Sequence, residues 1–339
     1  MNKERKILKE ALEQFEKLTG LKADTEWNPG NNDKGIDAII TIPKLKFKLY
    51  AEVKLNLTNQ TMGGIVHMLN DLYAEEKVIL ITRYVTPQLA DRLKELKVFF
   101  LDTAGNMYIN IPDMLLFVKG NKTKMLPPEE KPVRAFQPAG LQLIYALLCN
   151  PGLENKPYRT MAEKANIANG AVALAIKDLK KLQYLVDMRE KGRKLKNKKE
   201  LLQRWVNQYA ELLRPKLFEG RYKVEDKDWW KNQDITKYNA RLGGETAAAM
   251  LTKYLKPEEH TIYIDDNKGK IVLQLRLKND PKGNVELVKK FWNFNDTKEK
   301  NIVNPILVYA DLLATGNNRN IETAKIIYEQ EIIQYIRED

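Results

Sequence analysis

The sequence has only one cysteine and two histidines among its 339 residues. A single cysteine excludes an internal disulfide bond and every CxxC metal or redox motif. The two histidines, His67 and His260, are too few for a His-rich zinc site and leave little material for a Ser–His triad. Any catalysis by this chain would therefore depend on carboxylates and lysines.

Long apolar runs are also missing. The longest one, Leu143 to Cys149, has seven residues, whereas a membrane-spanning helix needs about 20. The first residues, MNKERKILKEALEQF, carry charges where a signal peptide needs an apolar stretch. We therefore expect a cytoplasmic protein with no membrane partner.

The composition is that of a globular protein with a basic surplus. Hydrophobic residues make up 43% and charged residues 30% of the chain, and the net charge is +12. Such a surplus favours a polyanionic partner. Between Arg189 and Lys199 the sequence has seven basic residues and one acidic residue, Glu190, which is the strongest charge run in the chain.

Proline and charge divide the chain into blocks. The segment Leu126–Pro132 contains three prolines, so it cannot continue a helix or a central strand and indicates a linker. The predicted fold class is α/β plus all-α. The predicted boundaries are an α/β domain at 1–125, a linker at 126–137, a helical domain with one basic hairpin at 138–216, and a C-terminal α/β domain at 217–339.

In the first block, an amphipathic helix with apolar residues from Ile7 to Leu18 is predicted to end at Gly20, and two alternating strands follow it. If these strands form a hairpin that turns at Lys44-Leu45, Asp37 lies opposite Glu52. Lys54 shares a strand face with Glu52, because the two residues are two positions apart. Two facing carboxylates repel each other, and a bridging divalent cation would remove that repulsion.

These residues resemble the PD-(D/E)xK motif of the restriction-endonuclease-like superfamily, with Asp37 as the aspartate and Glu52-Val53-Lys54 as the (D/E)xK. The resemblance implies an Mg²⁺-dependent nuclease in which Asp37, Glu52 and Lys54 are catalytic and Asp37 and Glu52 hold the metal. Glu10 or Glu13 of the first helix is a candidate for a further carboxylate. The alternative is a solvent-facing strand surface on which charged residues alternate without a chemical role.

The second block has the pattern of a winged helix-turn-helix. Helices are predicted at 141–149, 158–165 and 169–183, with the short turn Asn166-Ile167-Ala168 between the last two. Strands at 184–188 and 191–195 then predict a hairpin with a basic tip. The candidate DNA-binding residues are Asn166, Asn169, Lys177, Lys180, Lys181, Arg189, Lys191, Arg193, Lys194 and Lys196. The alternative is a helical packing module with a solvated basic hairpin.

In the third block, the Gly243-Gly244 pair is predicted to open a helix of small residues whose N-terminus could hold an anion. The alternation after Asp265-Asp266 predicts a strand at 270–277, with the two aspartates in a turn. We expect Trp229, Trp230 and Trp292 to pack rather than to stack on bases.

The order of these blocks resembles the AbiEi-type transcriptional regulators, the antitoxins of type IV toxin–antitoxin systems. The segments that carry the resemblance are 99–109, 138–141, 200–206, 241–248 and 309–313. The resemblance implies a DNA-binding regulator of antitoxin type with double-stranded DNA as partner, a toxin protein as a further partner, and a homodimer as the candidate assembly. Two alternatives stay open: an Mg²⁺-dependent nuclease, and a protein-interaction module that neutralises a toxin. No cofactor is expected except Mg²⁺ in the nuclease alternative.

Overall fold

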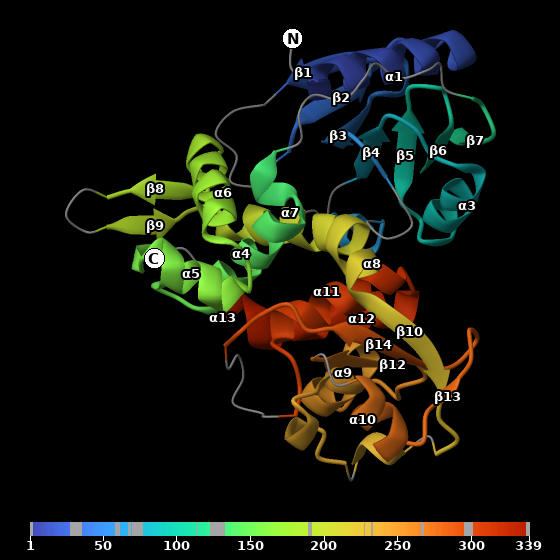
Figure 1. Cartoon of the computed structure of the whole chain (residues 1–339). Coiled ribbons are helices and arrows are strands. Elements are labelled where there is room, and N and C mark those ends of the chain that lie inside the picture. Colours follow the sequence, from blue (N-terminus) through green and yellow to red (C-terminus); the bar gives the residue numbers. More distant parts are fainter. Residues whose placement is uncertain are drawn as a thin grey trace. The chain divides into compact units, whose positions relative to one another are not determined.

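The computed structural model describes residues 3–27, 36–57, 62–66, 69, 77–112, 114–122, 133–188, 192–226, 228–231, 233–265, 268–294 and 301–336. The chain divides into two compact units, Met1–Glu129 and Glu130–Asp339 (Figure 1). Among the described residues, no helix is both long enough and apolar enough to cross a membrane.

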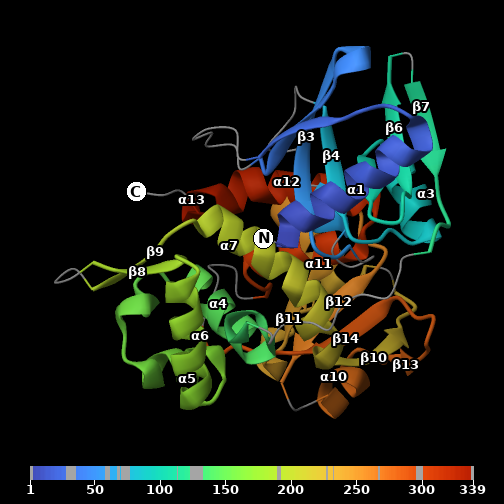
Figure 2. The ribbon, with the colours of Figure 1, turned by 90° about the horizontal axis from the view of Figure 1, so that it is seen from above.

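The first unit is built on a seven-stranded sheet in the order β1-β2-β3-β4-β5-β6-β7. Strands β3, β4 and β5 are parallel, and the outer pairs are antiparallel. The helix α1 lies across the sheet against β3, β4 and β5 (Figure 2). The strands are β1 (Asp24–Trp27), β2 (Ala38–Ile42), β3 (Phe47–Lys54), β4 (Val78–Thr82), β5 (Phe99–Asp102), β6 (Met107–Ile111) and β7 (Met114–Val118), and the labelled helices are α1 (Lys3–Thr19) and α3 (Pro87–Glu95).

The predicted first helix and its end are confirmed. α1 buries its stripe from Ile7 to Phe15, and the N–H of Gly20, at φ +69°, donates to the Glu16 carbonyl at 2.8 Å. A glycine is suited to this position because the left-handed conformation costs it little. The expected burial of Leu18 is wrong, since 51% of its surface is exposed. It lies in the last turn, beyond the buried stripe.

The predicted β2–β3 hairpin is also confirmed. Ala38 pairs with Ala51, and Ile42 pairs with Phe47. A 3-10 turn at Pro43–Leu45 closes the hairpin. Continuing the same register toward the start of β2 places Asp37 opposite Glu52. The outer strands β1 and β7 were not predicted, because three of the four β1 residues are polar and β7 is apolar without alternation.

In the second unit, the predicted helices of the second block are all present. They are α4 (Pro138–Cys149), α5 (Tyr158–Ala165) and α6 (Asn169–Lys181). The two-stranded hairpin of β8 (Leu185–Asp187) and β9 (Arg193–Leu195) follows and projects away from the helices (Figures 1 and 2). The helix α7 (Lys198–Gln208) continues through a π-helical turn at Tyr209–Leu213 into α8 (Arg214–Leu217).

A five-stranded mixed sheet in the order β11-β12-β14-β10-β13 forms the rest of the second unit. Its strands are β10 (Phe218–Lys223), β11 (Arg241–Gly243), β12 (His260–Ile264), β13 (Lys278–Asn279) and β14 (Val285–Lys289). The helices are α9 (Gly244–Thr252), α10 (Lys268–Gln274), α11 (Pro305–Thr315), α12 (Asn318–Ile327) and α13 (Ile333–Ile336). The first of these, α9, packs against α11 and α12.

The strand predicted at 270–277 is wrong, because most of this segment forms α10. Leucine and isoleucine at alternate positions imitate a strand face there. In the structure, Ile271 and Leu275 lie four residues apart and are buried, whereas Leu273 is 81% exposed. The segment therefore has a helical burial period.

One hydrophobic core runs through the second unit. The ring of Tyr145 on α4 stacks on Trp205 of α7, with centroids 5.5 Å apart, and contacts Phe291 at 5.1 Å. Trp229 and Trp292 are buried and Trp230 is partly buried, which confirms the expectation that they pack. The helical block and the C-terminal block thus share one core. The predicted linker at 126–137 falls mostly outside the described residues.

Candidate nucleic-acid interface and two polar sites

The helices α5 and α6 cross through small and branched residues. Ala162 and Ala165 of α5 and Val172 and Ile176 of α6 are all buried. The turn between the helices begins at Asn166 in the left-handed conformation, with φ +54°, and the N–H of Ile167 donates to the Ala162 carbonyl at 3.0 Å. Asn tolerates this backbone conformation better than most residues. The local geometry therefore explains Asn166 without a ligand, while Ile167 packs half-buried against the core.

The outer face of α6 is exposed from its first turn to its end. The exposed residues are Asn169, Gly170, Ala173, Leu174, Lys177 and Lys181. Three of the predicted contact residues, Asn169, Lys177 and Lys181, therefore share one solvent-facing side. Lys180 differs, because its Nζ donates to the Asp187 carboxylate on β8 at 2.6 Å. It ties α6 to the hairpin and has a partner within the protein.

The β8–β9 hairpin is fixed to the helices by Asn155, which the sequence did not single out. The Asn155 Oδ1 accepts from the Arg193 N–H at 2.6 Å, and its Nδ2 donates to the Arg193 carbonyl at 2.9 Å. Gly192 lies beside it at φ +78°, and a Cβ there would be 2.3 Å from Asn155 Oδ1. Glycine is therefore required at this position both for conformation and for space.

The structure describes three of the five predicted basic residues of this hairpin. Arg193, Lys194 and Lys196 lie on or beside β9 and are half-buried. The Arg193 guanidinium sits 5.4 Å from the Tyr158 ring centroid and donates to the Lys156 carbonyl at 3.1 Å. These contacts hold Arg193 at the junction of hairpin and helices. Arg189 and Lys191, predicted at the tip, lie outside the described residues.

The three predicted residues of the first unit come together. Asp37 Oδ2 accepts from the Val53 N–H at 2.7 Å, and the Lys54 Nζ donates to Glu52 Oε1 at 2.5 Å. Burial, followed by the neighbouring Glu52 carboxylate, raises the pKa of Asp37 to about 7. Burial by itself would lower the pKa of Lys54, but the carboxylates of Glu52 and Asp37 outweigh it and raise that pKa.

The alternative of a solvent-facing strand surface is wrong for Glu52, which is only 5% exposed. The carboxylate that α1 brings near the pair is Glu4, whose charge acts on both Asp37 and Lys54. Glu10 and Glu13 instead form exposed pairs with lysines of their own helix. No group of three or more His, Cys, Asp or Glu side chains with metal-binding geometry occurs among the described residues.

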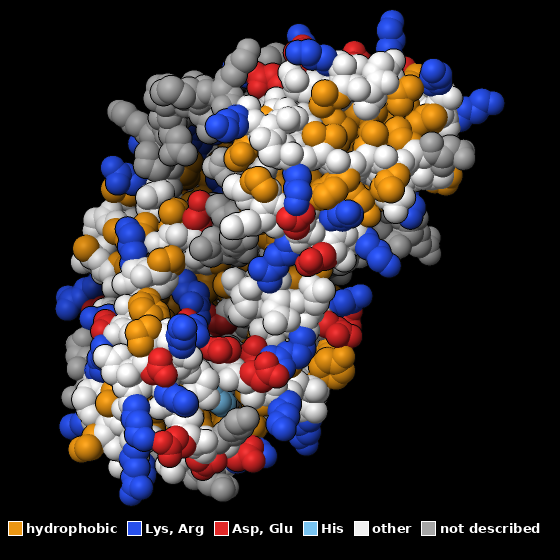
Figure 3. Space-filling view, turned by 90° about the vertical axis from the view of Figure 1, so that its right-hand side faces the viewer, with side chains coloured by type: hydrophobic (Ala, Val, Ile, Leu, Met, Phe, Trp, Pro, Cys, Tyr) orange, Lys and Arg blue, Asp and Glu red, His pale blue; other side chains and the backbone are white. Residues whose placement is uncertain are grey.

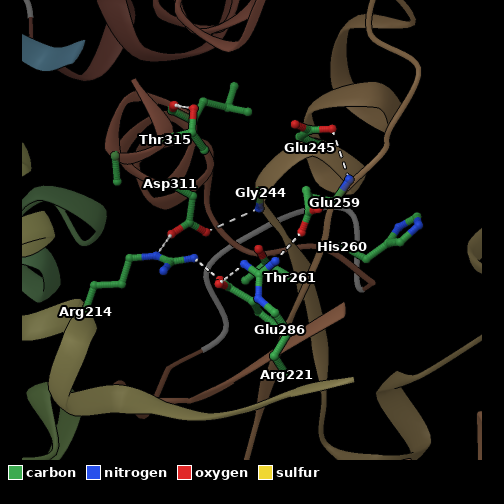
Figure 4. Close-up of a pocket in the computed structure, with 12 residues that line it drawn as sticks. Arg214, Arg221, Gly244, Glu245, Glu259, His260, Thr261, Glu286, Asp311 and Thr315 are labelled. Carbon is green, nitrogen blue, oxygen red and sulfur yellow. Dashed lines mark hydrogen bonds and ion pairs between the residues drawn. The ribbon is translucent and has the colours of Figure 1, made fainter. Parts of the chain in front are cut away.

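A charged cavity of about 310 Å³ lies in the second unit (Figure 4). Arg214 of α8 donates from Nη2 to Glu286 at 2.7 Å and from Nε to Asp311 at 3.2 Å. Arg221 of β10 also binds Glu286 and reaches Glu259 at 2.9 Å. On the face of the second unit seen in Figure 3, acidic and basic side chains are likewise interleaved rather than forming a field of one sign.

The inner end of the cavity is a buried polar network. Tyr209 and Tyr263 donate to the Asp311 carboxylate at 2.9 and 2.8 Å. The Gly244 N–H donates to the other Asp311 oxygen at 3.2 Å. The anion site expected at the start of α9 is therefore filled by the chain's own Asp311. Because the network joins α8, α9, α11 and β12, its hydrogen bonds hold these elements together, which is a structural role.

The family comparison concerns the same part of the chain. Residues 194–333 match the family model described as "Transcriptional regulator, AbiEi antitoxin, Type IV TA system". The match begins in β9 and covers the mixed sheet and its helices, so the resemblance inferred from the sequence is supported over this segment. No curated protein and no solved structure matches the chain.

Proposed function

We propose that this chain is a transcriptional regulator of antitoxin type that binds double-stranded DNA through a winged helix-turn-helix formed by α4, α5, α6 and the β8–β9 hairpin. The observation that carries the proposal is the exposed face of α6, with Lys177 and Lys181, beside a hairpin that carries Arg193, Lys194 and Lys196. In this architecture the second helix of the turn enters the major groove, while flanking basic groups contact phosphates.

The start of α6 supports this placement. Its N-cap residue, Ala168, provides no side-chain hydrogen bond, and its carbonyl accepts from the Ala171 N–H at 3.0 Å. The N–H groups of Asn169 and Gly170 at the start of the helix can therefore reach a phosphate oxygen. The exposed Asn166 and Asn169 lie at this end, and the two lysines lie further along the helix. The predicted contacts therefore combine phosphate contact by the first N–H groups and the lysines of α6 with base contact by the exposed side chains from Asn169 to the middle of the helix.

The family match supports the regulatory part of the proposal, because the matched family consists of antitoxin transcriptional regulators. By this likeness, the mixed-sheet block at 217–339 would bind a toxin protein. A homodimer would place two copies of α6 on a two-fold-symmetric operator. A regulator of this kind acts in the cytoplasm. Co-purification with the product of a neighbouring gene tests the toxin partner directly.

DNA binding is tested with paired lysine variants. Fluorescence anisotropy with labelled duplex DNA compares wild type with Lys177→Ala/Lys181→Ala, and with Lys253→Ala/Lys256→Ala as a control at two exposed lysines elsewhere in the second unit. We expect the first pair to weaken binding at least tenfold and the control pair to leave it unchanged. Equal affinities for all three proteins would contradict the proposed interface. Repression of a reporter placed behind the bound DNA then tests the regulatory role.

A second candidate function, an Mg²⁺-dependent nuclease of PD-(D/E)xK type, is favoured by one observation. Asp37, Glu52 and Lys54 meet at the β2–β3 hairpin in the predicted register. If the two carboxylates bind Mg²⁺, the metal stabilises the unit by RT ln(1 + [L]/Kd). Incubating plasmid DNA with and without Mg²⁺ tests the activity. Cleavage by wild type that is lost in Lys54→Ala would establish it, and intact plasmid would leave this site a structural one.

A further inference from the structure

The exposed face of α6 is apolar where it would meet bases. Leu174 is 52% exposed, although the same helix buries Val172, Ile176 and Leu179 almost completely. Gly170 and Ala173 lie next to Leu174 on the exposed side. About half of the Leu174 surface is therefore left uncovered by the core and is available to an apolar group of a partner.

This apolar strip continues directly into the basic part of the same face. Gly170, Ala173, Leu174, Lys177 and Lys181 follow one another at helical spacing, so they form one stripe. Negative charge on a partner would complement the lysines, and an apolar group between those charges would complement Leu174. A DNA major groove offers both, since it is bordered by phosphates and presents the thymine methyl groups.

The N-terminal half of this stripe, before Lys177, also disfavours some base pairs. Guanine is read by arginine or lysine, which donate to its O6 and N7, and cytosine is read by an acceptor for its N4 amine. Among the described residues, the exposed N-terminal half of α6 presents neither a cation nor a carboxylate. It presents Asn169, whose amide can pair with adenine N6 and N7.

We propose that α6 selects A·T base pairs, with Leu174 and Ala173 packed against thymine methyl groups and Asn169 bonded to adenine. This inference rests on the proposed DNA-binding function and names its target. At the same place, the polar groups of a G·C pair would lose their hydrogen bonds to water without gaining a partner on the helix. This loss weakens the binding of α6 to a site with a G·C pair. Leu174 is then a specificity-determining residue.

The test removes one methyl group from the DNA. Binding sites are first selected from a randomised duplex pool, and each thymine of a selected site is then replaced by uracil, which keeps the base pair but lacks the methyl group. We expect A·T-rich half-sites. Wild type should lose about fourfold in affinity at each thymine that contacts Leu174 or Ala173, the effect of one buried methyl-sized group.

A variant comparison assigns the effect to Leu174. Leu174→Ala should bind the thymine duplex more weakly and should no longer respond to uracil at the position that this side chain contacts. Leu273→Ala is the matched control, because Leu273 is an exposed leucine of the same unit, and it should respond to uracil as wild type does. Melting temperatures confirm that both variants are folded.

The outcomes separate this inference from the function on which it rests. No binding to any duplex at low salt would refute the proposed function and the inference together. Binding to DNA with G·C-rich selected sites, or with equal affinity for thymine and uracil duplexes, would overturn the inference and leave DNA binding standing. A uracil effect that persists in Leu174→Ala at every position would overturn the role of Leu174.

Discussion

Asn155 holds the backbone of Arg193 from both sides: its Oδ1 accepts from the Arg193 N–H at 2.6 Å, and its Nδ2 donates to the Arg193 carbonyl at 2.9 Å. The two residues are 38 positions apart in the chain. This double contact fixes the turn end of the β8–β9 ladder, where Asp187 pairs with Arg193, against the turn before α5. The direction of the hairpin therefore depends on a side chain outside it.

Replacing Asn155 by alanine should release the hairpin without unfolding the unit. Two net hydrogen bonds at an exposed site are worth roughly 1–2 kcal/mol in the free energy of unfolding. Affinity for duplex DNA should fall several-fold in Asn155→Ala. Asn150→Ala is the control, because Asn150 forms one bond to its own helix and does not touch the hairpin. Equal DNA affinity in the two variants would show that hairpin orientation does not matter.

A glutamate at the α5–α6 crossing should abolish the fold of this block. Ala162 is 4% exposed, and an unpaired carboxylate buried there costs several kcal/mol. Thermal melting should show loss of the cooperative transition, or a large decrease in its midpoint, for Ala162→Glu. Ala173→Glu, on the exposed face of α6, should melt like wild type and weaken DNA binding by repelling phosphates. A normal melting curve for Ala162→Glu would contradict the close crossing.

The second unit should lose stability in mild acid because of His260. This side chain is 2% exposed, contacts Thr246 Oγ1 through Nδ1 at 2.8 Å, and has its pKa lowered by burial to about 4. The unfolded chain takes up the proton near pH 6.5 and the folded chain only near pH 4. Stability therefore falls as the pH drops through this window, by about 3 kcal/mol.

Tryptophan fluorescence is a suitable probe of this effect, because four of the five tryptophans belong to the second unit. Denaturation curves at several pH values should show the loss in wild type and a smaller one in His260→Gln. Identical pH dependence in the two proteins would mean that His260 titrates normally in the folded state.

The first unit should show the opposite trend because of Asp37. Its pKa rises to about 7 in the folded state through burial and Glu52, whereas an unfolded aspartate titrates near pH 3.9. The folded state is thus favoured below that value and loses this advantage as the pH rises toward 7. The opening free energy obtained from amide exchange in β2 and β3, after correction for the intrinsic pH dependence of exchange, should fall over this range by roughly 2 kcal/mol after allowance for partial exposure. Asp37→Asn should remove most of the change, and an unaltered pH profile would contradict the assignment.

Local sequence signals located much of the fold. Gly20 predicted the end of α1, and the alternation on either side of Lys44-Leu45 predicted the hairpin register. These signals succeed because caps and turns depend on residues close in sequence. The short turn Asn166-Ile167-Ala168 likewise predicted the boundary between α5 and α6.

Long-range contacts could not be predicted. No sequence pattern near Asn155 predicts its hydrogen bonds to Arg193. The alternation at 270–277 indicated a strand, but the segment forms a helix because tertiary packing decides which of its residues are buried. The network around Asp311 joins Tyr209, Arg214 and Tyr263, up to 102 positions apart. A solvent-facing surface was the alternative for Glu52, and the fold buries this residue instead. The alternation of charged residues along this strand would be the same whether Glu52 were buried or exposed, so the sequence pattern could not decide between the two.

The central claim, that the α4–β9 block binds duplex DNA through its basic hairpin, is tested most directly by the salt dependence of binding. Wild type is compared with Arg193→Ala/Lys194→Ala/Lys196→Ala and with the control Lys253→Ala/Lys256→Ala/Lys282→Ala in anisotropy titrations over a range of KCl concentrations. Each phosphate contact that is lost lowers the slope of log K against log [KCl] by about 0.9. We predict a slope reduced by up to about 2.7 in the hairpin variant and unchanged in the control. A slope equal to that of wild type in the hairpin variant would contradict the account.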